Sequence, residues 1–155
     1  MKSLHILTKT PIDTNTIKAE IKELYKTKKL YSETEVYLYI GVAPNSFIID
    51  FNNEGYFSGP DCFFSEKTIN LVPIKNPVFA ILSYHKPSIA RKIVSVILKH
   101  YKEVWVYDDE YLWIGPAQEY INSNHQTDVN YIGYNHESLL YDNEGKPIPF
   151  KNDRK

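Results

Sequence analysis

Apolar residues near the start of the chain recur with the period of a helix. Between residues 14 and 30 they fall at i, i+4, i+7 and i+8, which places them on one helical face. They are Ile17, Ile21, Leu24 and Tyr25. Asp13 precedes them as an N-cap. We predict a first helix from Thr14 to about Leu30. Its opposite face is expected to be solvated and carries Lys18, Lys22, Lys26 and Lys29.

A second helix is predicted after Pro87, a residue that suits the first turn of a helix. Its apolar face is formed by Ile89, Ile93, Val96, Ile97 and Tyr101. Two apolar runs flank it, Pro77–Tyr84 and Val104–Tyr107, and we interpret both as strands. A strand–helix–strand unit of about 30 residues is typical of a crossover between parallel strands.

Short runs of β-branched and aromatic residues predict the other strands. They are Leu4–Thr8, Glu35–Val42, Phe47–Phe51, Ile69–Ile74, Tyr111–Ile114 and Val129–Tyr134. A hairpin turn is expected at 43–46, a loop at 53–68 and a short helix over 115–121. The pattern therefore predicts a single α+β domain over 1–141, with a mixed, mostly antiparallel sheet flanked by two main helices. A polar tail is expected over 142–155.

Length and composition agree with a folded domain and exclude several other classes. The chain has 155 residues, of which 43% are hydrophobic and 24% are charged, values that exclude a disordered or collagen-like chain. No apolar run approaches the ~18 residues of a membrane span, and the N-terminal run is too short for a signal peptide. One cysteine, Cys62, has no second cysteine for a disulfide. We expect a cytoplasmic protein.

Charge is distributed unevenly along the chain. Residues 1–102 hold 14 Lys and Arg against nine acids, whereas residues 103–145 hold nine acids and no Lys or Arg. This acidic segment, residues 103–145, also contains two Trp and six Tyr. Acids that steer a basic partner and aromatic anchors that pack against it are typical of a protein-binding surface. The alternative is a solvated face of acids above core aromatics, and the sequence leaves it open.

The candidate partner-binding residues lie around the predicted hairpin turn and the short helix of the acidic segment. They are Asp108, Asp109, Glu110, Tyr111, Trp113, Glu119 and Tyr120. A divalent-metal site at 108–110 is less favoured than a charged turn, because consecutive residues of an extended chain point alternately. No zinc spacing, phosphate-binding loop or nucleic-acid module is present. We predict no catalytic residue, no metal and no cofactor.

Two other functions remain as alternatives. His85 lies where a strand meets a helix, a frequent site position in α/β sheets, with Lys86, Ser88 and Arg91 nearby in sequence. This arrangement suits a small-molecule-binding protein or an enzyme that holds an anion. The abundant Trp and Tyr suit a carbohydrate-binding module in which rings stack on sugars.

Residues 77–121 resemble the small immunity proteins of bacterial polymorphic toxin systems, including contact-dependent growth inhibition. The resemblance lies in the second helix with Val104–Glu110, followed by Gly115–Ile121. It implies a single small α/β domain in the cytoplasm that is not an enzyme. Such a protein binds and neutralises a cognate toxin domain, a basic protein, and has no membrane or nucleic-acid partner. The net charge of −1 departs from the strongly acidic members, which leaves a nuclease target open.

Overall fold

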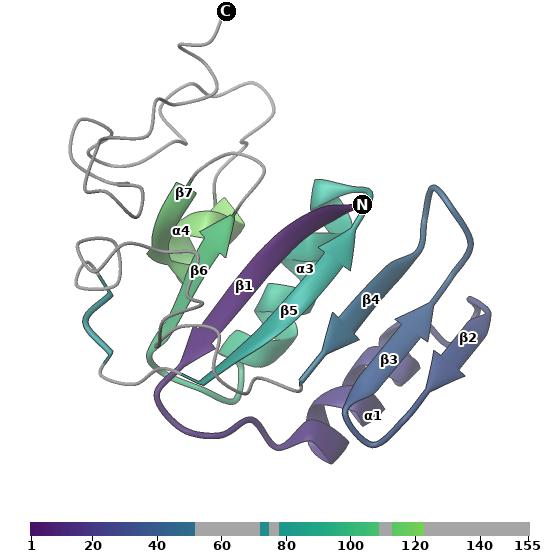
Figure 1. Cartoon of the computed structure of the whole chain (residues 1–155), viewed down its shortest axis with the longest axis horizontal. Helices are drawn as coiled ribbons and strands as arrows, with labels where there is room; N and C mark the ends of the chain where they lie inside the picture. Colours follow the sequence, from purple (N-terminus) through teal and green to yellow (C-terminus); the bar gives the residue numbers. More distant parts are fainter. Residues whose placement is uncertain (52–71, 75–77, 109–112, 123–155) are drawn as a thin grey trace, which may run out of the picture.

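The computed structural model describes residues 1–51, 72–74, 78–108 and 113–122 (Figure 1). The strands of this part form one sheet in the order β2-β3-β4-β5-β1-β6-β7, and every pairing in it is antiparallel. The strands are β1 (Lys2–Thr8), β2 (Leu30–Glu33), β3 (Tyr37–Ile40), β4 (Phe47–Asp50), β5 (Val78–Tyr84), β6 (Val104–Asp108) and β7 (Trp113–Pro116). The helices are α1 (Thr14–Leu24), α3 (Pro87–Leu98) and α4 (Ala117–Asn122).

The α+β class is confirmed, with all described helices on one face of the sheet. In Figure 1, α1 lies behind β3 and β4, and α3 lies behind β5. Contacts of α3 with both α1 and α4 place the three helices in one layer. Strand residues that face this layer are buried, as Leu38 and Ile49 show, because the apolar face of each helix covers them.

The predicted crossover unit is confirmed, with one strand inserted into it. Both β5 and β6 pair with β1 in antiparallel register, so they run parallel to each other on either side of it. The helix between them, α3, buries Ile93 completely and packs on the sheet. The N-terminal strand β1 therefore pairs directly with β6, which lies near the C-terminal end of the described residues.

The first helix is shorter than predicted. It ends at Leu24, Tyr25 forms its C-cap, and the chain then turns into β2, which the sequence did not reveal. Ile17 and Ile21 are buried as expected, but Leu24 is 50% exposed. Tyr25 packs against the sheet in place of Leu24. Its ring lies on Phe47 of β4, with 5.0 Å between the ring centroids.

Lys18 is buried, which corrects the expectation of a fully solvated lysine face. Its ammonium group donates to the carbonyl of Thr34 at 2.8 Å and lies 3.0 Å from the carboxylate of Glu33. Lys22 reaches the same carboxylate at 3.1 Å. Both lysines hold the pKa of Glu33 below its usual value. These contacts attach β2 to α1.

The remaining boundaries differ by a few residues. Strand β3 is shorter than Glu35–Val42, and residues 72–74 form a bend rather than the end of a strand. Gly115 and Pro116 belong to β7, so the short helix α4 begins at Ala117. The predicted strand at 129–134 and the tail at 142–155 lie outside the described residues.

His5 is a buried histidine in the central strand. It lies opposite Tyr107 in the pairing of β1 with β6, and the two rings meet edge to face at 5.9 Å. Burial lowers the pKa of His5 from 6.5 to about 4. The folded protein therefore holds this imidazole neutral at a pH where the unfolded chain protonates it.

We predict that this difference makes folding less stable in mild acid. Between pH 6.5 and 4 the unfolded chain binds a proton that the folded chain does not, so stability falls as pH falls, by up to about 3 kcal/mol. Urea unfolding at several pH values measures the slope, and a His5→Leu variant should show a smaller slope between pH 6.5 and 4.5. Equal slopes in both proteins would contradict the assignment.

Candidate functional site

The first part of the acidic segment folds as the β6–β7 hairpin followed by α4. Strand β7 is the last strand of the sheet, and its pairing with β6 runs from Trp105↔Pro116 to Asp108↔Trp113. The predicted hairpin is thereby confirmed. Of the candidate residues, Asp109, Glu110 and Tyr111 lie outside the described residues, as does the side chain of Trp113.

Asp108 is fully buried, so it is not the exposed turn residue that the sequence analysis expected. Strand alternation puts it on the helix side of the sheet together with Val104 and Val106. Its Oδ2 accepts a hydrogen bond of 3.3 Å from the hydroxyl of Tyr84 in β5. A carboxylate that is buried in this way cannot contact another protein directly.

Tyr120 is also fully buried, which corrects a second expected contact residue. It lies on the inward face of α4 with Ala117, and α4 packs against α3, β6 and β7. The outward face of the same helix is polar. It exposes Gln118, Glu119 and Asn122. Glu119 is therefore the one member of the predicted set whose side chain the structure describes as exposed.

The fold separates the described part of the acidic segment, residues 103–108 and 113–122, from the lysines of the first helix. The sheet order puts β2, with α1 beside it, at one edge, and β6, β7 and α4 at the other. The α1 lysines Lys18 and Lys22 thus lie away from the described acids of the segment, and both pair with Glu33 instead. Among the described residues, cations nearer to this part of the chain include Lys9, 4.0 Å from Glu103 in an exposed pair, and Lys102, which lines a pocket with Glu103.

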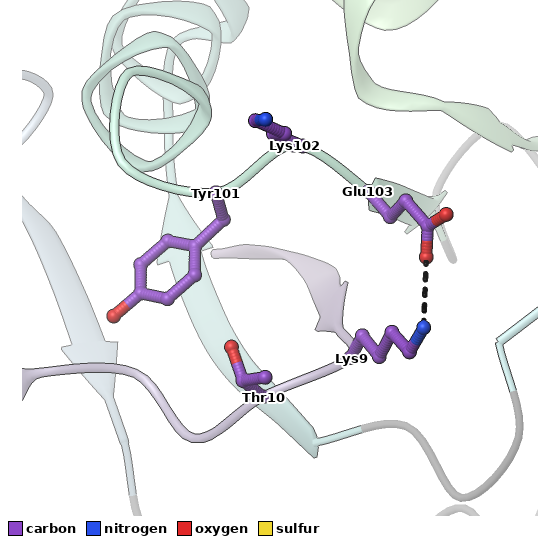
Figure 2. Close-up of a pocket in the computed structure, with 5 residues that line it drawn as sticks. All are labelled: Lys9, Thr10, Tyr101, Lys102 and Glu103. Carbon is purple, nitrogen blue, oxygen red and sulfur yellow. Dashed lines mark ion pairs between the residues drawn. The ribbon is translucent and has the colours of Figure 1, made fainter.

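A pocket of about 270 Å³ opens where β1 ends and the chain enters β6 (Figure 2). It is lined by Lys9, Thr10, Tyr101, Lys102 and Glu103. The hydroxyl of Tyr101 is held by the backbone, accepting from the N–H of Asp13 at 2.6 Å. Figure 2 shows Lys9 and Glu103 facing each other at one side. At this volume the pocket is smaller than the usual ~300–1,000 Å³ of ligand sites.

Near the strand–helix junction at His85, the side chain of Arg91 has a buried nitrogen that makes no hydrogen bond. His85 and Arg91 are both partly buried, and no hydrogen bond joins them. The Nη1 atom of Arg91 is buried without a hydrogen-bond partner. Lys86, at the N-cap of α3, makes no side-chain capping bond. The residues that the sequence analysis grouped as an anion site thus do not form a connected hydrogen-bonded set.

A cluster of tyrosines on the open face of the sheet was not predicted. Tyr37 and Tyr39 of β3 point away from the helix layer, and Tyr31 of β2 stacks on Tyr39 with 4.7 Å between ring centroids. The alternation of Tyr with Leu and Ile in residues 37–40 is the signal that shows two tyrosines sharing one face. The third tyrosine, Tyr31, lies in β2, a strand that the sequence analysis did not find.

Comparison with known proteins does not name a function. No family model, no curated protein and no solved structure matches this chain. Within the described ranges, no three His, Cys, Asp or Glu side chains are grouped so that they could hold a metal ion. None of the helices in that part of the chain is long and apolar enough to cross a membrane.

We predict that reversing the charge at two acids of this region affects stability very differently. Asp108→Lys places an ammonium group in the buried position and removes the acceptor of Tyr84, so it should cost about 3–5 kcal/mol. Glu119→Lys changes an exposed side chain and should stay within about 0.5 kcal/mol of the unmodified protein. Denaturant unfolding followed by circular dichroism measures both, and similar losses in the two variants would refute the assignment.

Proposed function

We propose that the protein is an immunity protein that binds and neutralises a cognate toxin domain through the acidic edge of its sheet. The observation that carries this proposal is the separation of charge. Nine acids and no basic residue occupy 103–145, and the described part of this segment forms β6, β7 and α4, with β7 at the sheet edge opposite β2. An acidic surface of this kind attracts a basic protein and orients it before contact.

The structure changes which residues this proposal relies on. Asp108 and Tyr120 support the surface from inside, because both are buried. Glu119 on α4 is exposed, and Asp109 and Glu110 lie between β6 and β7 in the sequence. We propose that these three acids face the toxin, and that the protein acts in the cytoplasm of the cell that it protects, without catalysing a reaction.

Binding should depend on where the charge is changed. Glu110→Lys with Glu119→Lys should slow association with the toxin about tenfold or more, because rim charges act mainly on the on-rate. Glu20→Lys with Glu23→Lys is the matched control, since it changes net charge equally on α1 at the far side of the sheet. Surface plasmon resonance at two salt concentrations measures the rates.

The biological readout is protection. A protein captured by the tagged chain should kill bacteria when it is expressed alone and should be harmless when the chain is co-expressed. The variant with Glu110→Lys and Glu119→Lys (the acidic-edge variant) should lose this protection. The variant with Glu20→Lys and Glu23→Lys (the α1 variant) should keep it. The proposal fails if both variants protect equally well and if the association rate does not change with salt.

A further inference from the structure

Strand β2 forms an open edge of the sheet. In the part of the chain that the structure describes, β3 is the strand that pairs with it, and Figure 1 shows β2 as the outermost strand on the side away from β7. Every residue from 26 to 36 is exposed, a run that contains the whole strand. Thr34 donates its backbone N–H to the carbonyl of Tyr37 at 2.9 Å, so the N–H and C=O of the preceding residue, Glu33, point away from β3. An edge of this kind can accept a further strand.

Exposed apolar side chains lie along this edge. Leu30 and Tyr31 belong to β2 itself. Val42 lies near the start of the strand, because the N–H of the preceding Gly41 donates to the carbonyl of Lys29 at 2.8 Å. Leu30 is 48%, Tyr31 60% and Val42 64% exposed. A second strand laid along β2 would remove part of this apolar surface from water, which favours pairing.

Charge along the same edge changes sign from one end to the other. Lys28 and Lys29 lie just before β2, and Glu35 lies two positions after its last residue. No ion pair joins these three side chains to other described residues; the ammonium group of Lys29 lies 5.3 Å from the centre of the Tyr31 ring. Lysines on an edge strand normally repel a second strand. Two copies of this edge aligned antiparallel instead set the basic end of each against the acidic end of the other, and opposite charges across a strand pair are stabilising.

We propose that β2 is the interface of a homodimer, in which the β2 strands of two copies pair antiparallel around a two-fold axis near Ser32. The axis places Lys29 of each copy beside Glu35 of the partner subunit, so the ion pair forms twice. Because β2 has four residues, the interface is small, and the dimer forms at high protein concentration. The two sheets join into one, with β7 at both outer ends. The inference does not rest on the function proposed above, since the partner is a second copy of this chain.

The two charged positions are too far apart to interact within one chain. Glu35 follows Lys29 by six positions, which is roughly 20 Å of extended chain. Exposed charges are screened beyond about 8 Å at physiological ionic strength. Any coupling between the two positions must therefore come from a second copy, in which they lie side by side. A charge swap between them tests this directly, because it leaves the net charge of the chain unchanged.

Sedimentation equilibrium of the full chain at increasing concentration, up to about 1 mM, measures the dimer. We expect the average mass to rise toward twice the 18.1 kDa of one chain, and the exchange of the Glu33 amide proton to slow in parallel. Lys29→Glu and Glu35→Lys should each raise the dissociation constant of the dimer about tenfold or more, because the two-fold axis makes each change act twice. The double variant with both changes should return to within about threefold of the unmodified protein.

Glu119→Lys is the matched control for Glu35→Lys. It changes the net charge equally, on an exposed side chain of α4 near the other edge of the sheet, and should leave the dissociation constant within about twofold. Circular dichroism checks that each variant is folded, as expected for changes at exposed positions.

Three results would overturn the inference. The first is a monomer at every concentration. The second is a double variant that dimerises no better than the single variants. The third is a loss in Glu119→Lys as large as that in Glu35→Lys, which would assign the association to the acidic edge. All three are measured on the chain alone, so they are separate from toxin protection, which tests the proposed function.

Discussion

The pairing of β1 on both of its edges is the interaction on which the rest of the fold depends. Its backbone bonds to β5 on one side and to β6 on the other, from Lys2↔Tyr84 to Thr8↔Val104. The strand is buried on both faces, with Leu4, Ile6 and Leu7 fully enclosed. Because β5 and β6 run parallel, they need a long connection, and α3 supplies it. Each outer group of strands is then fixed to the centre, β2–β4 through β5 and β7 through β6.

This central strand also determines where charge and aromatic residues gather. Lys26, Lys28 and Lys29, between α1 and β2, lie at one end of the sheet, and β7 with the exposed Glu119 of α4 lies at the other, because β1 and β5 stand between them. Helices cover one face only among the described elements, so the face that carries Tyr37 and Tyr39 stays partly open at the β2 end. One topology therefore separates two chemically different surfaces. The five residues that link β1 to α1 bring the chain from the middle of the sheet to the side of β3 and β4.

Strong apolar periodicity made most of the strands and helices predictable. Most of the wrong predictions concern which side of a strand or helix a side chain faces. The apolar run at 78–84 and the apolar face of α3 are long patterns, and both elements form where the sequence predicts them. Asp108 was misplaced because three consecutive acids resemble a turn, whereas strand β6 continues through it and directs it inward. Lys18 was misplaced because its partners are Glu33, at the end of a strand without apolar alternation, and the carbonyl of Thr34, which follows that strand. The sequence contains no local signal for a contact of that kind.

The acids on which the proposed function relies act at a distance. Exposed charges are screened beyond about 8 Å at physiological ionic strength, and within that range they orient a basic partner before it touches the protein. Strand β2, which the lysines of α1 contact, and strand β7 are six strand spacings apart, which is roughly 29 Å. Charges separated by that distance are screened from each other, so a charge reversal on α1 leaves the field near α4 almost unchanged. In the proposed complex the acids therefore govern how fast the partner arrives.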